Sequence, residues 1–184
     1  MNNNRSENGL HRGMAGSMAR VLLAGVFALA VTGIASAQMN RGVRFDGGIG
    51  VIPVTGVAAD GTVKLNVVRG VNPGAPWRIT DLDAVVSPNN GHIDVVGRHL
   101  LLANGNGIGT NGGASVHATL FCGNADNTAT PFDSAAVALE HDGDFRIDGF
   151  LTAVPPNPCT NPALLIRVGQ PGGGVWFAAG IPRP

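Results

Sequence analysis

Residues 79–102, ITDLDAVVSPNNGHIDVVGRHLLL, contain two apolar stretches with the pair Asn90-Gly91 between them. From Ile93 onward the side chains alternate with a period near two, which is typical of a β-strand that packs one face against a core. The central residues of a tight hairpin turn take positive φ angles, which glycine adopts freely and asparagine tolerates. This stretch therefore predicts two antiparallel strands joined by a turn.

The same turn signal occurs twice more, because Asp60-Gly61 and Asp142-Gly143 each separate two apolar stretches. After residue 37, no segment of a dozen residues has a sustained helical period with caps. The other predicted strands lie at residues 51–57, 63–68, 115–122, 135–139, 145–151, 164–168 and 175–179. So many short strands predict an all-β fold, an antiparallel β-sandwich of about nine strands that is immunoglobulin-like in outline.

The first 37 residues have the features of a secretory signal peptide. Three arginines precede an uncharged stretch at residues 21–37, which ends in Ala35-Ser36-Ala37, a small-x-small pattern that fits signal peptidase. At about 1.5 Å per residue, a helix over this stretch falls short of the roughly 30 Å of hydrocarbon in a bilayer. We therefore expect cleavage between Ala37 and Gln38, with an uncleaved N-terminal anchor as the alternative.

The expected organisation has three parts: a signal peptide at residues 1–37, a flexible N-terminal segment at 38–48, and a β-sandwich domain at 49–184. Met14 and Met18 are alternative starts to Met1. An exported chain of this kind would be periplasmic or extracellular and would keep no stable membrane anchor after cleavage.

Charge is scattered over the part of the chain that follows the leader. Nine basic and eleven acidic side chains remain after residue 37, which gives a net charge of −2. They form no basic stripe of the kind that binds nucleic acid or an anionic membrane. The sequence therefore predicts no nucleic-acid partner and leaves the actual partner unknown, although an exposed edge strand would allow a homodimer.

The chain has two cysteines, Cys122 and Cys159, and both follow the leader. Disulfides persist in the oxidising compartments that exported proteins reach. We expect one bridge between them, and on the loop-entropy model it adds roughly 3 to 4 kcal/mol of stability. Two buried free thiols are the alternative.

Residues 107–112 match the G-x-G-x-x-G pattern of dinucleotide-binding loops. Such a loop is followed by a helix whose N-terminus faces the pyrophosphate. Here residues 114–122 have the pattern of a strand instead. We therefore interpret the glycines as a hairpin loop and predict no cofactor.

Two groups of side chains resemble metal ligands in type. The acidic group, in which carboxylate oxygens suit calcium, is His141, Asp142, Asp144 and Asp148. The bidentate glutamate of a calcium loop is absent, and Asp142-Gly143 is explained as a turn. The histidine group is His92, His99 and His117. A spacing of seven puts His92 and His99 on opposite faces of a regular strand, so we predict no metal site.

The sequence contains no G-x-S-x-G, S-x-x-K or H-E-x-x-H motif. Asp81 and Asp83 fall on one face of a predicted strand, where paired carboxylates either serve acid–base catalysis or are simply solvated. Trp77 and Trp176 are interpreted as core anchors in preference to an exposed carbohydrate platform. No residue is assigned a catalytic role.

Four short segments of the predicted domain stand out together: Gly74-Ala75-Pro76-Trp77, Leu120-Phe121-Cys122, Pro158-Cys159 and Trp176-Phe177-Ala178-Ala179. They resemble a loose group of small exported bacterial β-rich proteins of unknown function, which have a signal peptide and two cysteines. The resemblance spans roughly residues 51–180. It implies export, a β-rich fold and a disulfide, and it implies no activity, cofactor or catalytic residue.

These observations predict an exported, non-enzymatic β-sandwich protein, an envelope-associated or secreted binding or structural module of unknown ligand. The alternative is a small exported hydrolase or metal-binding protein that uses histidine or aspartate residues at the loop rims. The two hypotheses differ measurably, because only the second predicts turnover or stoichiometric metal.

Overall fold

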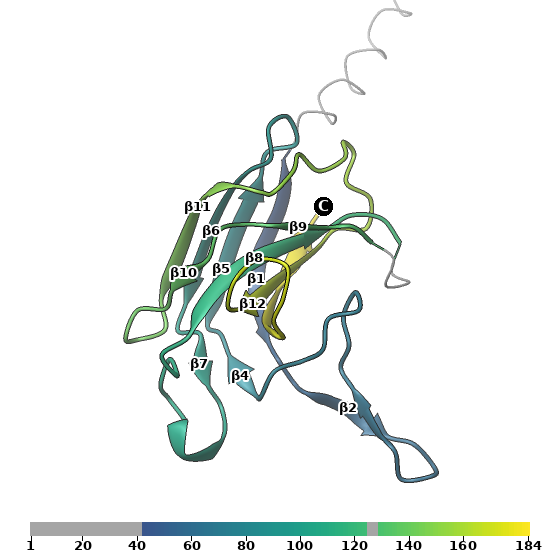
Figure 1. Ribbon diagram of the computed structural model, residues 1–184, viewed down its shortest axis with the longest axis vertical. Helices are drawn as coiled ribbons and strands as arrows, with labels where there is room; N and C mark the ends of the chain where they lie inside the picture. The colour runs from purple at the N-terminus through teal and green to yellow at the C-terminus, as the bar shows by residue number, and fades with distance from the viewer. Residues whose placement is uncertain (1–41, 125–128) are drawn as a thin grey trace, which may run out of the picture.

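The computed structural model describes residues 42–124 and 129–184 and shows an all-β chain (Figure 1). The predicted signal peptide at residues 1–37, with its cleavage between Ala37 and Gln38, lies outside the described residues. Within the described residues, nine strands form one antiparallel sheet, so the all-β prediction is confirmed.

The strands of the main sheet are β1 (Val43–Gly50), β5 (Asp81–Val86), β6 (His92–Arg98), β8 (Ser115–Phe121), β9 (Pro131–Asp133), β10 (Val137–Ala138), β11 (Phe145–Phe150), β12 (Ala163–Val168) and β13 (Trp176–Arg183). Their order is β10-β8-β12-β13-β1-β5-β6-β11, with β9 paired to β8. Two short pairs lie outside this sheet: β2 (Val54–Val57) with β3 (Val63–Leu65), and β4 (Trp77–Arg78) with β7 (Leu101–Leu102). One 3-10 turn, η1, spans Gly105–Gly107.

The main sheet folds over itself into two layers (Figure 1). Strands β8, β9, β10 and β12 lie across from β1, β5, β6 and β11, and the two ends of the strand order meet where β10 contacts β11. The layering is that of a sandwich. It differs from two separate sheets in one respect, because β13 and β1 are hydrogen bonded and join the layers into one sheet.

Apolar side chains from both layers fill the space between them. Along β5, Leu82, Ala84 and Val86 are buried while the intervening residues are exposed, as the alternation predicts. Trp77 and Trp176 are both buried, and Trp77 stacks on Phe177 with the ring centroids 4.2 Å apart. Both tryptophans are therefore core anchors, as predicted.

One glycine in the core gives room for an aromatic ring. Gly97 lies opposite Phe145 in the β6–β11 pair, and a Cβ atom at Gly97 would overlap the ring of Phe145. A side chain at this position would force the two strands apart or displace the ring. Glycine here is required by packing.

The turn signals in the sequence have two different outcomes. Asn90-Gly91 joins β5 to β6 and Asp60-Gly61 joins β2 to β3, with φ angles of 72° at Gly91 and 84° at Gly61. Asp142-Gly143 joins β10 to β11, but these strands pair with β8 and β6 and not with each other. The third predicted hairpin is therefore a connection between the two layers.

The sandwich begins earlier than residue 49, the predicted boundary. β1 starts at Val43, within residues 38–48, which the sequence predicted to be flexible. The register with β13 shifts between Phe45 and Gly48, so a bulge interrupts the alternation there. Because of this bulge, the sequence does not alternate with a period of two here, and the strand was not predicted.

The predicted bridge between Cys122 and Cys159 is present. It links the end of β8 to the segment that leads into β12, and Cys122 is 8% exposed. The disulfide therefore reinforces the pairing of β8 with β12, which are neighbours in one layer.

Candidate interaction surface

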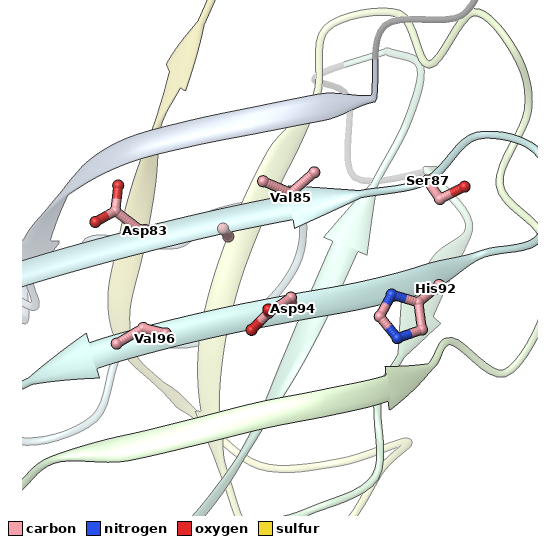
Figure 2. A pocket seen from close by; sticks show the side chains of 7 residues that line it. Asp83, Val85, Ser87, His92, Asp94 and Val96 are labelled. Carbon is pink, nitrogen blue, oxygen red and sulfur yellow. The ribbon is translucent and has the colours of Figure 1, made fainter.

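A shallow pocket of about 370 Å³ lies on the outer face of β5 and β6. Strand alternation sends every second side chain of these strands outward, and Figure 2 shows the labelled ones: Asp83, Val85, Ser87, His92, Asp94 and Val96. Both predicted carboxylates of β5, Asp81 and Asp83, are exposed, as expected for one face of a strand. The pocket combines an apolar floor with polar groups at its rim.

The carboxylates beside this pocket are largely paired. Arg146 Nη2 donates to Asp94 Oδ2 at 2.7 Å and lies 3.4 Å from Asp148 Oδ2. His92 Nε2 is 3.0 Å from Asp148 Oδ1, and the ring of His92 packs edge-on against Phe150. Exposed pairs of this kind contribute at most about 1 kcal/mol each. The network therefore consists of weak contacts across an open sheet face.

A catalytic hydroxyl needs a base within hydrogen-bond reach. Among the described contacts, none joins the hydroxyl of Ser87 to a histidine or a carboxylate, although its backbone N–H donates to His92 O at 2.8 Å. What the pocket offers a small polar molecule is hydrogen bonding to Asp83 and Asp94 above two valines. We assign no catalysed reaction to this pocket.

A second polar cluster is buried beneath the loop between β12 and β13. His117 is 0% exposed, and its Nδ1 lies 2.9 Å from Gly169 O. A carbonyl oxygen only accepts, so Nδ1 carries the proton of the neutral ring. Nε2 is then left without a hydrogen-bond partner, 3.8 Å from Asp133 Oδ1.

Asp133 organises this buried cluster. Thr119 Oγ1 donates to Asp133 Oδ1 at 2.6 Å, and the backbone N–H of Gly172 donates to Asp133 Oδ2 at 2.8 Å. The guanidinium of Arg167 lies 3.9 Å from Asp133 and donates to Gly174 O at 2.9 Å. The cluster therefore ties β8, β9 and β12 to the loop at Gly172 and Gly174.

Burial lowers the pKa of His117 below its ordinary value of 6.5, even though Gly169 O and Asp133 favour the charged ring and Arg167 opposes it. In the unfolded chain, the ring of His117 takes up a proton near pH 6.5. In the folded chain, it does so only at a lower pH. The stability contributed by the neutral ring is therefore complete above about pH 6.5 and declines as the pH falls towards the folded pKa.

We accordingly expect the melting temperature of the wild type to fall more steeply between pH 7 and pH 5 than that of the variant His117→Asn. Asparagine keeps a donor for Gly169 O but cannot be protonated in this range. The matched control is His141→Asn at an exposed position, which should decline in parallel with the wild type. Equal slopes for His117→Asn and the wild type would contradict this role of His117. Thermal unfolding followed by near-UV circular dichroism measures all three.

The predicted ligand groups do not converge. His92 lies on the outer face of β6, His117 is buried in β8, and His99 has a positive φ of 51° just after β6. Asp144 accepts from the backbone N–H of His99 at 2.9 Å and from Arg98 at 2.7 Å, and both contacts lower its pKa. In residues 42–124 and 129–184, no group of three or more His, Cys, Asp or Glu side chains is placed to hold a metal.

The glycine-rich loop at residues 107–112 begins at Gly107, the last residue of η1, and strand β8 follows it from Ser115. No helix N-terminus is present in this described segment to face a pyrophosphate. The glycines therefore lie in a loop between β7 and β8, but it is not the predicted hairpin loop, because β7 pairs with β4 whereas β8 pairs with β9, β10 and β12.

A concentration of exposed apolar side chains lies on the segment that projects from the sandwich around β2 (Figure 1). We call residues 52–67 the β2–β3 hairpin. Its exposed apolar side chains, with their exposed fractions, are Ile52 (67%), Val54 (41%), Val57 (65%), Val63 (53%), Leu65 (51%) and Val67 (44%). Single exposed apolar residues are ordinary on soluble proteins, whereas a contiguous patch marks an interaction site.

Within residues 42–124 and 129–184, no other layer covers the hairpin. β2 and β3 pair only with each other, and all three residues of β3 are exposed, so neither face of this small sheet is buried. A two-stranded hairpin of this kind is at best marginally stable in water by itself. Strands were predicted at residues 51–57 and 63–68, and β2 and β3 lie within those ranges.

The root of the hairpin is fixed to the core. Asn66 Nδ2 donates to Ile52 O at 3.0 Å, and Asn66 O accepts from the indole N–H of buried Trp176 at 3.0 Å. At the tip, the backbone N–H of Thr62 donates to Asp60 Oδ1 at 2.9 Å. The apolar surface is therefore presented on a backbone whose two ends are defined by hydrogen bonds.

Comparison of the chain with protein-family models, curated proteins and solved structures gave no match. The described residues include no helix with the length and apolar character needed to cross a membrane.

Proposed function

We propose that the chain is an exported, non-enzymatic structural or binding module, and that the β2–β3 hairpin is its contact surface for another macromolecule. The observation that carries the proposal is the set of six apolar side chains on the hairpin, each between 41% and 67% exposed. Burying side chains of this size stabilises a complex by about 1.5–3 kcal/mol each when burial is complete. Within the described chain, the hairpin therefore has apolar surface whose burial by a partner would stabilise a complex.

Two features support export to the periplasm or the medium. The Cys122–Cys159 bridge is of the kind that persists in oxidising compartments. Residues 1–37 have the charge and apolar pattern of a signal peptide. A module in that compartment acts among envelope or secreted macromolecules.

The proposal predicts that charge on the hairpin releases the protein from its partner. In cells that export it, the double variant Val57→Asp/Val63→Asp is expected to be at least about tenfold less abundant in the envelope fraction or in sedimenting assemblies, relative to free protein. Placing two carboxylates at valines that the proposed contact would bury costs more than the 1.4 kcal/mol that a tenfold change requires. Fractionation followed by quantitative immunoblotting measures the ratio.

The matched control is Ile108→Asp, because Ile108 is 66% exposed on a loop away from the hairpin. The control should distribute as the wild type does, and circular dichroism should show that both variants are folded. An unchanged distribution of the hairpin variant would overturn the contact surface. Turnover by the wild type on a panel of hydrolase substrates, or stoichiometric metal in it, would overturn the non-enzymatic assignment.

A further inference from the structure

β2 has a free edge with little protection against pairing. Its residues, Val54-Thr55-Gly56-Val57, include no charge and no proline, whereas β3 carries Lys64 at its centre. Natural edge strands are protected by charges, prolines, bulges or covering elements. A register shift between Val54 and Gly56 supplies a bulge against β3, but nothing covers or charges the outer edge in the described chain. This edge is open to another strand.

The outer edge of β2 carries no charge that would repel a second copy of the same strand. An uncharged edge has no group that selects a partner with complementary charges, and opposed like charges are the main penalty in cross-strand pairs. A second β2 strand meets it without such a penalty. The hairpin as a whole carries Asp60 and Lys64, so its formal charge is zero and two copies do not repel.

We propose that two copies of the chain associate through antiparallel pairing of their β2 strands, with the exposed apolar side chains of the hairpins packed between the copies. The arrangement is isologous, as two-fold dimers are, because the same strand contributes from both sides. Each β2 strand gains backbone hydrogen bonds on its open edge. This inference rests on the proposed function and names its partner as a second copy.

A lipid surface is a poorer occupant for this hairpin. To enter a bilayer the hairpin would lead with its tip, where Asp60 lies. The backbone N–H of Thr62 lowers the pKa of Asp60, so the carboxylate is ionised at neutral pH. Placing that charge in hydrocarbon is unfavourable, whereas at a dimer interface the tip stays in water.

The size of the hairpin sets the expected strength of the dimer. Stable interfaces involve about 20–30 residues from each side. The hairpin supplies residues 52–67, fewer than this number. We therefore expect a dimer that dissociates on dilution and does not behave as an obligate pair.

Sedimentation velocity over a wide concentration series, on the protein exported and purified from the medium or periplasm, tests the inference. The wild type is expected to shift from monomer to dimer as concentration rises. Thr55→Lys and Thr55→Glu, at the exposed centre of β2, should each raise the dissociation constant at least about tenfold, because two like charges then meet across the two-fold axis. An equimolar mixture of the two variants should recover dimer that neither forms alone.

The control Ile108→Lys should dimerise as the wild type does. A wild type that stays monomeric at every concentration, or a Thr55→Lys variant that dimerises normally, would overturn the second copy as partner. Binding of the monomeric wild type to phosphatidylcholine vesicles, abolished in Thr55→Lys, would assign the hairpin to lipid instead.

Sedimentation velocity and envelope retention together distinguish failure of the dimer from failure of the proposed contact surface. A monomeric wild type whose envelope retention is still lost in Val57→Asp/Val63→Asp would reject the dimer and leave the contact surface in place. Unchanged retention in that variant, together with a wild type that stays monomeric at every concentration, would reject both.

Discussion

Asp133→Ala is expected to lower the free energy of unfolding by about 3 kcal/mol. Asp133 is 6% exposed and accepts hydrogen bonds from Thr119 and from the backbone of Gly172. Removing one member of a buried ion pair typically costs 3–5 kcal/mol, because the remaining charge is uncompensated. We place this site at the lower end, since Arg167 keeps its contact with Gly174 O.

Urea denaturation followed by tryptophan fluorescence measures the change, with Asp148→Ala as the matched control. Asp148 also contacts an arginine, but its side chain is 54% exposed, so its removal should change stability by less than about 1 kcal/mol. Asp133→Asn should fall between the two, because the amide oxygen still accepts a hydrogen bond while the charge is gone. Equal losses in Asp133→Ala and Asp148→Ala would show that the buried cluster adds nothing beyond a surface pair.

The double variant Cys122→Ser/Cys159→Ser is expected to lose about 4 kcal/mol of stability. The bridge joins residues 37 apart in sequence, and loop closure of that length restricts the unfolded chain by this amount in the chain-entropy model. Such a loss is a large fraction of the 5–15 kcal/mol that stabilises a typical domain. Reduction of the wild type should have a similar effect.

Urea unfolding with and without dithiothreitol provides the measurement. The double variant is its own control, since a reductant cannot change its stability when no bridge remains. Identical unfolding midpoints for the oxidised wild type and the double variant would contradict a stabilising role for the bridge.

The features that could be predicted from the sequence are those set by local chemistry. Gly91 and Gly61 identify their turns because glycine readily adopts the positive φ found at both positions, whereas Asn90 and Asp60 do not have the positive φ that was expected of them. The pairing of Cys122 with Cys159 could be predicted because the chain has two cysteines and its first 37 residues have the pattern of a leader. These predictions needed no knowledge of which strands become neighbours.

What escaped prediction depends on distant partners. His117 is buried because the loop at Gly169 covers the outer face of β8. The residues near His117 in the sequence give no sign that a distant loop packs there. Conversely, Val57 and Leu65 are apolar like core residues, yet they are 65% and 51% exposed in the part of the chain that the structure describes. Periodicity and composition show which side chains of a strand are apolar. They do not show whether another layer of the fold packs against those side chains.

The position of β13 has a consequence for how the chain acquires its fold. This strand, the last of the described strands, lies between β12 and β1, and Arg44 in the first described strand pairs with Arg183. During synthesis, the two layers therefore cannot be joined until β13 has been made. Contacts between such distant residues also form slowly, which lengthens the interval in which the polypeptide remains unfolded. On the proposal that the chain is exported, that interval is the one in which an unfolded polypeptide can pass through a translocation pore.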